Sequence, residues 1–302
     1  MTQNNRARTR CGYVAIVGRP NVGKSTLLNA LVGEKISIVS RKAHTTRHNT
    51  LGVINRGGAQ AVFIDTPGLN RDRKHALHRL MAKAIHQAIA DADVILMVTD
   101  AARLTAEDRR LGSMLEQHAD RTILVLNKSD ALTRRTDLLA RLKDASEAFH
   151  CSAFVPVSAA KHQNLDRLIG EILNRLPEGP ALFPPGFVTD KDTRFRIAET
   201  IREKLLSALH QEVPYGLTVE IEHLDRAEGR LIVHAMIWLG KDGHKAIVIG
   251  KGGRVLKAVG RAARIELARA LGESVHLELW VKVRANWSDS ERELKNLGFE
   301  RS

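Results

Sequence analysis

The sequence predicts an α/β domain, with a mostly parallel sheet and helices on both faces, followed by a small α+β domain. Two observations support this prediction. Short β-branched runs alternate with helical patterns from residue 13 to residue 176, as is typical of βαβ units. A proline-rich stretch then interrupts the alternation, and beyond it the order of elements becomes α-β-β-α-α-β.

In the first domain, strands are expected at the apolar, β-branched runs, and helices are expected where apolar residues recur at helical spacing. The expected strands are residues 13–17, 50–56, 61–64, 94–99, 122–127 and 153–157. The expected helices are residues 24–31, 80–90, 106–118, 136–149 and 165–176.

Residues 177–186 hold four of the eight prolines and can continue neither a helix nor a strand, so they mark a linker between domains. Beyond it we expect a helix, two strands, helical turns, a third strand and a short amphipathic piece. These elements are placed at residues 193–210, 215–223, 230–239, 250–253, 275–284 and 288–297. The predicted divisions are a basic tail (1–11), a first domain (12–176), a linker (177–189) and a second domain (190–302).

The chain has 302 residues, a formal charge of +13 and a sequence pI near 10.1. Such an excess suits a polyanionic partner, either nucleic acid or an acidic membrane surface. No apolar run reaches the ~18 residues that a spanning helix needs, and the first residues lack the apolar core of a secretory signal. Cys11 and Cys151 have no metal-ligand spacing. We therefore expect a cytoplasmic protein.

A phosphate-binding loop follows the first predicted strand and precedes the first predicted helix. The eight residues fit GxxxxGK[ST]: Gly18, Arg19, Pro20, Asn21, Val22, Gly23, Lys24 and Ser25. Glycines let consecutive backbone N–H groups wrap phosphates closely, and the helix N-terminus adds its positive dipole end. In this motif Lys24 reaches the β- and γ-phosphates, and Ser25 binds magnesium.

Two further tetrapeptides end predicted strands of the same sheet, where doubly wound folds bind ligands. The first is Asp65, Thr66, Pro67 and Gly68, and the second is Asn127, Lys128, Ser129 and Asp130. A carboxylate at Asp130 can accept both the ring N–H and the exocyclic amino group of guanine. Adenine lacks that pair of donors and would leave the carboxylate unpaired. The combination predicts a site for GTP and GDP.

With Ser158 and Ala159 after the last strand, these sets resemble the boxes of Ras-like GTPases. The resemblance implies that residues 44–48 form the first switch, where Thr46 is the better match to the magnesium-binding threonine and Thr45 the alternative. It also implies that the Ala159 N–H binds the guanine carbonyl and that Lys128 covers the base. Catalysis is expected from Lys24, Thr46 and Gly68, and magnesium ligation from Ser25, Thr46 and Asp65.

One departure from the Ras pattern concerns hydrolysis. Leu69 follows Gly68, where Ras-type enzymes carry the glutamine that orients water. A hydrophobic residue there resembles the Era group of GTPases, whose members often also carry a potassium-binding asparagine at the position of Asn21. We expect slow intrinsic hydrolysis, with charge stabilised by Lys24 and magnesium. Whether potassium binds at Asn21 is left open, because the dependence varies within the group.

The second domain contains an IGxxGxx motif between two helical pieces. Glycines there let a loop approach the sugar-phosphate chain of four nucleotides. Between Lys241 and Arg269 there are eight basic residues against two acidic ones, a balance that suits a polyanion. The candidate RNA-binding residues are Ile249, Gly250, Lys251, Gly252, Gly253, Arg254, Lys257 and Arg261.

This arrangement resembles Era-group GTPases that end in a type II KH domain, over residues 12–299. The resemblance implies a monomer that binds near the 3′ end of small-subunit ribosomal RNA and acts in small-subunit assembly. Two alternatives stay open. In one, the chain is a switch that signals through a protein effector and the second domain is a scaffold. In the other, the positive charge holds the chain weakly at the membrane surface.

Overall fold

The computed structural model describes residues 9–69, 75–209 and 216–299 of the chain. Contacts divide the chain into two compact units, which are described separately below. The first unit comprises Met1–Ser37, Thr46–Arg71 and Met81–Asp190, and the second comprises Ile38–Thr45, Asp72–Leu80 and Lys191–Ser302.

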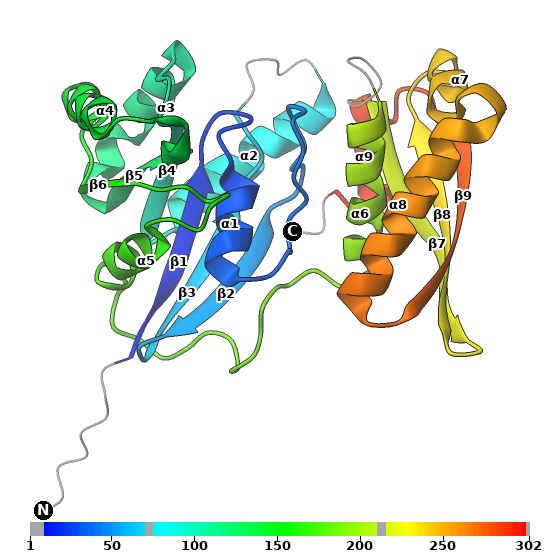
Figure 1. Cartoon of the computed structure of the whole chain (residues 1–302), viewed down its shortest axis with the longest axis horizontal. Helices are drawn as coiled ribbons and strands as arrows, with labels where there is room; N and C mark the ends of the chain where they lie inside the picture. Colours follow the sequence, from blue (N-terminus) through cyan, green and yellow to red (C-terminus); the bar gives the residue numbers. More distant parts are fainter. Residues whose placement is uncertain (1–8, 70–74, 210–215, 300–302) are drawn as a thin grey trace, which may run out of the picture. The chain divides into compact units, whose positions relative to one another are not determined.

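A six-stranded sheet forms the centre of the first unit (Figure 1). Its strands are β1 (Arg10–Val17), β2 (Thr50–Arg56), β3 (Ala59–Asp65), β4 (Val94–Asp100), β5 (Thr122–Asn127) and β6 (Ala153–Pro156). They lie in the order β2-β3-β1-β4-β5-β6, and all neighbours are parallel except the antiparallel pair β2 and β3. The expected, mostly parallel sheet is therefore confirmed.

Helices cover both faces of this sheet because side chains alternate along each strand. Val14 and Ile16 of β1 point into one core, with α1 (Lys24–Val32) and α5 (Leu165–Leu173). Ala15 and Val17 point into the other. That second core is closed by α2 (Ala76–Asp91), α3 (Ala106–Leu115) and α4 (Arg135–Ala148). Because β3, β1, β4, β5 and β6 run parallel, their carboxyl ends lie at the same edge of the sheet.

The proline-rich segment forms neither helix nor strand, as expected, and it is bound along the first unit. Gln60, which is buried in β3, accepts hydrogen bonds from the backbone N–H groups of Leu182 and Phe183 at 2.8 and 3.0 Å. It also donates to the Phe183 carbonyl at 2.9 Å. Further along, the Val53 N–H donates to the Val188 carbonyl at 2.8 Å. The linker is thus fixed to the first unit almost as far as Asp190.

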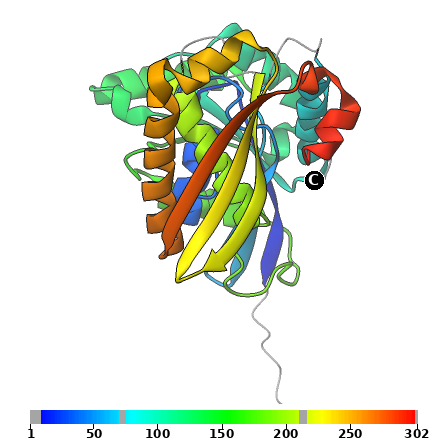
Figure 2. The same ribbon diagram turned by 90° about the vertical axis from the view of Figure 1, so that its right-hand side faces the viewer.

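The second unit has the expected α-β-β-α-α-β order. Its elements are α6 (Thr193–Ala208), β7 (Leu217–Ala227), β8 (Arg230–Leu239), α7 (Gly243–Ile249), α8 (Arg254–Leu271), β9 (Ser274–Val283) and α9 (Glu291–Asn296). β8 is antiparallel to β7 and parallel to β9. One face of this sheet packs on α6 and α8, and the other faces the viewer in Figure 2. Among the described residues, no helix is both long and apolar enough to span a membrane.

Several element ends differ from the sequence expectations. β1 begins at Arg10 rather than residue 13, because Arg10 and its neighbours pair with β3 although they lack β-branched side chains. α2 begins at Ala76 rather than residue 80. β7 continues to Ala227 rather than 223. Its register against β8 shifts between Ile221 and His223, and the two strands remain paired beyond the shift. The predicted helical turns near residues 250–253 lead into the eighteen-residue helix α8.

Candidate functional site

The phosphate-binding loop lies between β1 and α1, as the sequence predicted. Gly23 caps α1 in the left-handed conformation with φ of 96°, and Asn21 also has positive φ, 64°. A Cβ atom at Gly23 would stand 2.4 Å from the Asn127 amide nitrogen, and one at Gly18 would stand 2.5 Å from the Val98 carbonyl oxygen. Close approach therefore requires glycine at both positions, and the positive φ favours it at Gly23 as well. Pro20 and Val22 lie within the same loop.

Lys24 and Asp65 are buried charges of opposite sign at this loop. The Lys24 Nζ atom donates to the carbonyl oxygens of Gly18 and Arg19 at 3.0 and 3.1 Å, so it points across the loop. Burial lowers the pKa of Lys24 to about 8, with Asp65 opposing and Arg19 reinforcing the shift. Burial raises the pKa of Asp65, against the stabilising charge of Lys24 and the Ser25 hydrogen bond. The charged form of each side chain is therefore stabilised by the opposite charge of the other, and a bound ligand would stabilise it further.

Three oxygen-bearing side chains converge beside Lys24. The Ser25 hydroxyl donates to Asp65 Oδ2 at 2.7 Å and lies 2.8 Å from the Thr46 hydroxyl. The other carboxylate oxygen of Asp65 is buried and has no hydrogen-bond partner among the described residues. Hard oxygen donors of this kind are those that magnesium prefers. The three predicted ligands, from three segments of the chain, therefore fit a magnesium ion.

The two candidate switch threonines point to different partners. The Thr45 hydroxyl lies 2.7 Å from the Ser40 hydroxyl and donates to the Lys42 carbonyl at 2.7 Å, so it serves its own turn. Thr46 instead contacts Ser25. The geometry favours Thr46 as the threonine of the metal set.

Asn127 connects the three loops that would surround a nucleotide. Its amide nitrogen donates to the Val22 carbonyl at 2.9 Å. Its side-chain oxygen accepts from the Lys128 N–H at 2.8 Å and from the Ala159 N–H at 3.1 Å. The Ala159 N–H, expected to bind the guanine carbonyl, is here donated to Asn127. Because Asn127 is buried at 2% exposure, these bonds are shielded from water.

The predicted guanine-binding residues lie beside Asn127. Asp130 is exposed, and the Ser158 hydroxyl donates to its Oδ1 at 2.5 Å, which leaves the second oxygen to accept from a base. The Ser129 N–H donates to the Val157 carbonyl at 3.0 Å, so its backbone supports the loop. The Lys128 Nζ atom donates to the Asn21 carbonyl and to Asp100 Oδ2, both at 2.8 Å.

The residues after Asp65 differ in what they contact. Thr66 is buried, and its hydroxyl donates to the Ile16 carbonyl at 2.8 Å, so it holds β3 to β1. Gly68 lies against Pro20, because a Cβ atom there would stand 3.0 Å from the proline ring. Pro67 is buried between them. Leu69 packs against the core beneath the sheet, so its side chain supports the structure and supplies no polar group.

Two acidic residues at this site were missed from the sequence. Asp100 ends β4 and holds Lys128, and its position at the end of a parallel strand was the signal that could have found it. Asp108 is buried in the first turn of α3 and accepts a hydrogen bond from Arg19 Nε at 3.1 Å. Its only signal was the capping box that it forms with Thr105.

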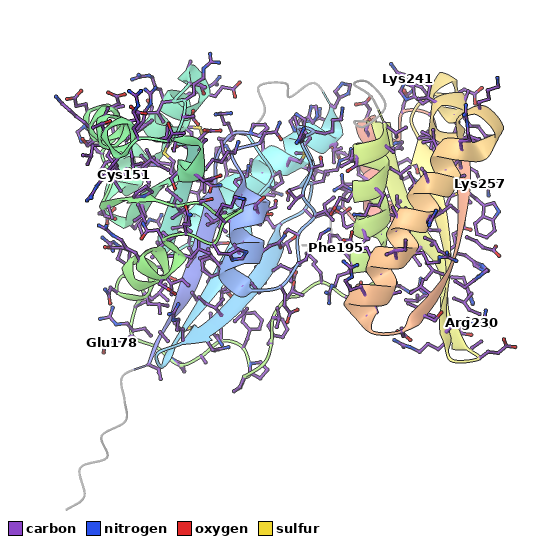
Figure 3. The ribbon with its side chains drawn as sticks, viewed as in Figure 1. Cys151, Glu178, Phe195, Arg230, Lys241 and Lys257 are labelled. Carbon is purple, nitrogen blue, oxygen red and sulfur yellow. The ribbon has the colours of Figure 1, made fainter. Side chains whose placement is uncertain are left out.

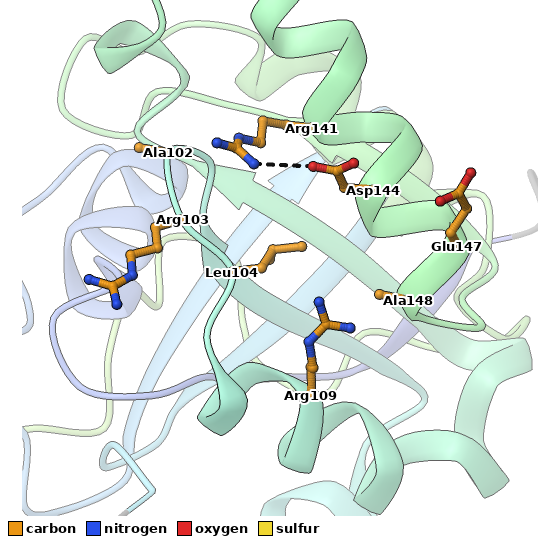
Figure 4. A pocket seen from close by; sticks show the side chains of 8 residues that line it. All are labelled: Ala102, Arg103, Leu104, Arg109, Arg141, Asp144, Glu147 and Ala148. Atoms are coloured by element: carbon orange, nitrogen blue, oxygen red, sulfur yellow. Dashed lines mark hydrogen bonds and ion pairs between the residues drawn. The ribbon is translucent and has the colours of Figure 1, made fainter.

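A separate cavity of about 430 Å³ lies between the loop after β4, α3 and α4 (Figure 4). Its charged lining consists of Arg103, Arg109, Arg141, Asp144 and Glu147. Arg141 and Asp144 pair with each other at 3.1 Å, and the other charged side chains are exposed to solvent. No predicted nucleotide-binding residue lines this cavity, so it is distinct from the site described above.

In the second unit, the glycine loop joins α7 to α8. Ile249 ends α7, and Gly250, Gly252 and Gly253 all have positive φ, between 61° and 76°. Beside the loop, a groove of about 410 Å³ runs between α8 and β9. Its floor is apolar and its rim is basic; the lining residues are Gly253, Leu256, Lys257, Gly260, Arg261, Arg264, Leu277 and Leu279.

The basic residues of this groove form one cationic stripe. Lys251 and Arg254 stand at the loop, while Lys257, Arg261 and Arg264 follow along α8; all are exposed. Figure 3 labels Lys257 on α8. Within the described part of the chain, none of the five forms an ion pair or a hydrogen bond through its side chain. An apolar floor with a free cationic rim suits unpaired bases on a phosphate chain.

Comparisons with known families agree with this division. Residues 13–128 match a family described as 50S ribosome-binding GTPase. Residues 212–288 match the KH domain family. The two matches cover the phosphate-binding loop, the guanine-binding loop up to Lys128, and the glycine loop.

Curated relatives and solved structures match almost the whole chain. GTPase Era of Haemophilus influenzae (strain PittGG) is 43% identical over 293 residues, which is 97% of each chain. GTPase Era of Bordetella petrii is 46% identical over 291 residues, 96% of this chain and 98% of that protein. A structure of a single-residue variant of Aquifex aeolicus Era bound to GDP·AlF4⁻ superposes with a TM-score of 0.90 at 38% identity, covering 96% of this chain and 99% of that one. Era in complex with MgGDPNP and nucleotides 1506–1542 of 16S ribosomal RNA gives 0.92, with the same identity and coverage.

Proposed function

Because the chain belongs to the Era family of GTPases, we propose that its GTPase cycle controls the binding of small-subunit ribosomal RNA during assembly of the small subunit. Membership of this family means that the chain is a GTPase, which hydrolyses GTP. The single observation that supports the RNA-binding half is the basic groove beside the glycine loop of the second unit. A relative of this family was solved with 16S ribosomal RNA nucleotides 1506–1542, and we extend that specificity to this chain.

The nucleotide site supports a division of labour among the predicted residues. Lys24 crosses the loop where phosphates would lie, and Asp130 is exposed to accept from guanine. We assign the magnesium ion to Ser25, Thr46 and Asp65, where it would neutralise charge between the phosphates. Because Leu69 packs against the core and has no polar group, we assign the positioning of water to backbone groups such as those of Thr46 and Gly68. Hydrolysis without a partner is accordingly slow.

The RNA site comprises the residues that the sequence singled out. Gly250 to Gly253 form the loop, Ile249 precedes it, and Lys251, Arg254, Lys257 and Arg261 carry the charge. Arg264 extends the same stripe and joins the set. The apolar floor between α8 and β9 would take the bases. This groove favours RNA over the alternative in which the second unit is a scaffold for a protein effector.

The proposal also covers the domain bounds, the location of the protein and its oligomeric state. The first domain would extend over residues 12–176 and the RNA-binding domain over 190–302, with 177–189 as the linker. We place the protein in the cytoplasm as a monomer. Its charge of +13 would strengthen attachment to the small ribosomal subunit, and would permit weak contact with an acidic membrane surface. Arg6 and Arg8 of the basic tail lie outside the described residues.

The decisive experiment replaces Lys251 and Gly252 together by aspartate. The Gly252 position is open, because nothing stands within 4 Å of a Cβ atom there, and aspartate tolerates positive φ. Two carboxylates at the loop would repel a phosphate chain. We expect binding to an RNA matching the 1506–1542 segment to fall by roughly a hundredfold or more, while GTP hydrolysis is unchanged.

A matched control is Gly229→Asp. Gly229 also has positive φ, 71°, in open space, but it lies in the turn between β7 and β8, away from the groove. It introduces the same side chain with the same backbone demand. Equal RNA affinity of the loop variant and this control would refute the RNA-binding proposal and favour a protein effector.

A further inference from the structure

The sheet of the second unit has an outer face that none of this unit's own described helices covers. Side chains alternate along β9, so that Leu277 and Leu279 point into the groove beside α8. Trp280 and Lys282 therefore project from the opposite face. Figure 2 shows the three strands with this face toward the viewer and α8 along one side.

A row of aromatic rings crosses this outer face, one from each strand. Trp280 of β9 is 41% exposed. Its ring meets the His234 ring of β8 edge to face, with centroids 5.3 Å apart. The His234 ring lies 5.1 Å from the His223 ring of β7. Trp280 and His223 are exposed and His234 is half-buried; because His234 meets Trp280 edge to face, the three rings form a platform on which a flat group can stack against Trp280.

Some charged residues around this platform form hydrogen bonds or ion pairs with other described residues through their side chains, and others do not. Glu220 accepts from the Trp238 indole N–H at 2.7 Å, and Glu278 lies 3.1 Å from His276 Nε2. Glu220 and Glu278 are thus bonded within the face, and Glu278 also lies 4.0 Å from Nε2 of His234. Lys282, two residues along β9 from Trp280, is exposed and forms no ion pair or hydrogen bond through its side chain among the described residues. An available cation beside an exposed ring suits a ligand that combines flat groups with negative charge.

A single strand, β9, separates the platform from the groove. β9 is the edge strand of the sheet, because the order is β7-β8-β9. Its inward residues Leu277 and Leu279 line the groove, while Trp280 follows immediately on the other face. A chain leaving the groove has only the width of this edge strand to cross before it meets the ring. The two surfaces can therefore be occupied by one continuous molecule.

We propose that the outer face is a second RNA-binding surface, where Trp280 stacks an unpaired base of the RNA strand that leaves the groove. The inference rests on the proposed function, because the groove must hold RNA for the strand to reach the ring. Stacking is tolerant of sequence since every base has a π-face. It would add affinity for RNA longer than the four nucleotides that a glycine loop clamps.

Single-stranded RNA fits this face better than a protein partner. A protein interface would need an apolar area around the ring as its centre. Trp280 is instead flanked on its own strand and face by Glu278 and Lys282. Its register partner on β8, Met236, is buried, and the nearby Trp238 ring is covered by the Arg284 guanidinium at 4.9 Å, so little exposed apolar area surrounds the Trp280 ring. An isolated stacking surface with an available lysine matches a base and its phosphate.

The test compares Trp280→Ala, Trp280→Phe and Ile265→Ala in the full chain. Ile265 is 50% exposed on α8 outside the groove lining, so it controls for loss of an exposed apolar side chain. The probes are two single-stranded RNAs that share a core, one of about five nucleotides and one of about twelve. We expect Trp280→Ala to bind the long RNA roughly tenfold more weakly and the short RNA normally. Trp280→Phe and Ile265→Ala should bind both RNAs within about threefold of the wild type.

Normal short-RNA binding by Trp280→Ala also shows that the variant is folded. Tryptophan emission gives a second readout on the wild-type chain: the long RNA should quench it more than the short one, and Trp280→Phe should remove the difference. If Trp280→Ala binds the long RNA as the wild type does, the inference is overturned and the face is left to a protein. If the Lys251→Asp and Gly252→Asp double variant still binds the short RNA, the groove proposal fails instead.

Discussion

The Nε atom of Arg19, in the phosphate-binding loop, donates a 3.1 Å hydrogen bond to Oδ2 of Asp108, a fully buried carboxylate in the first turn of α3. The same oxygen accepts from the Thr105 N–H and hydroxyl, both at 2.8 Å. One carboxylate therefore caps a helix and holds a loop residue 89 positions away. Because the Arg19 carbonyl accepts from Lys24, this bond also helps to place the lysine.

Asp108→Asn should weaken GTP binding and lower stability. An asparagine can keep one oxygen toward the three donors, but it loses the negative charge that strengthens those bonds and places a buried amide nitrogen where Oδ1 has no hydrogen-bond partner among the described residues, at a cost of about 1–3 kcal/mol in the free energy of unfolding. We expect the KM for GTP to rise severalfold. Thermal unfolding and steady-state hydrolysis measure the two effects. Glu107→Gln is the control, because Glu107 is the exposed neighbour in the same turn; similar losses in both variants would contradict the role of Asp108.

Thr46→Val should raise the magnesium concentration needed for hydrolysis, whereas Thr45→Val should not. The Thr46 hydroxyl lies 2.8 Å from Ser25 in the oxygen set, and the Thr45 hydroxyl bonds within its own turn. Loss of a metal ligand should reduce turnover at limiting magnesium at least about tenfold. Magnesium titration of both variants measures this. An effect confined to Thr45→Val would reverse the assignment of the switch threonine.

Asp130→Asn should change the preferred base. An asparagine amide can donate to the 2-carbonyl of xanthine, but it loses the pair of bonds that a carboxylate accepts from guanine. We expect GTP affinity to fall by roughly a hundredfold or more and XTP affinity to rise. Competition binding of the two nucleotides gives the ratio. Ser158→Ala removes the 2.5 Å bond to Asp130 and the 3.2 Å bond from the Lys161 N–H but keeps the carboxylate, so it should weaken GTP slightly and keep guanine preferred.

Nucleotide affinity should fall as the pH rises through the pKa of Lys24, which burial lowers to about 8. Phosphates bind the charged lysine, so affinity for GDP should drop about fourfold between pH 7 and 8.5. Binding should also take up protons, which calorimetry in buffers of different ionisation enthalpy detects. Guanosine, which has the base without phosphates, is the control. An affinity for GDP that is constant with pH would show that Lys24 keeps its charge in the free protein.

The lowered pKa of Lys24 makes the stability of the fold change with pH in the direction opposite to nucleotide affinity. In the unfolded chain Lys24 holds its proton up to its usual pKa of 10.5, so between pH 8 and 10.5 the unfolded state binds more protons. The unfavourable contribution of burying Lys24 is therefore relieved as the pH rises through this window. Over the same range, nucleotide binding weakens while this contribution to stability improves.

Potassium should accelerate hydrolysis if Asn21 binds it. We expect severalfold faster turnover in potassium than in sodium at equal ionic strength, because a cation beside the phosphates would stabilise developing charge. Asn21→Gly should remove the difference. Glycine accepts the φ of 64° and keeps the carbonyl that binds Lys128. Equal turnover of the wild type in the two salts would exclude the potassium role.

The sequence predicted the fold class and the order of elements because the central parallel strands are buried apolar runs. Val94–Asp100 and Thr122–Asn127 are buried over almost their whole length, and both strands begin where expected. The errors fall where context overrides local preference. α3 ends at Leu115 and a 3₁₀ segment follows, which includes the non-helical residue His118. No local signal marks that change.

The nucleotide site could be placed from motifs because its residues are contiguous in short loops at strand ends. The contacts that join those loops could not. Asp100 and Lys128 are 28 residues apart, and neither spacing nor residue type pairs them. The resemblance already favoured Thr46 over Thr45, but the contact between the Thr46 and Ser25 hydroxyls depends on backbone direction and could not be predicted from the sequence.

Asn127 joins the phosphate loop, the guanine loop and the Ala159 loop through one buried amide. Its neighbour Gly23 has no room for even a methyl group. Evolution of a new base preference therefore has little freedom at Asn127, because any replacement would disturb phosphate binding at the same time. Asp130, exposed and held by a single hydroxyl, can change without that penalty. Drift in nucleotide specificity should begin at the rim of the pocket and leave its centre unchanged.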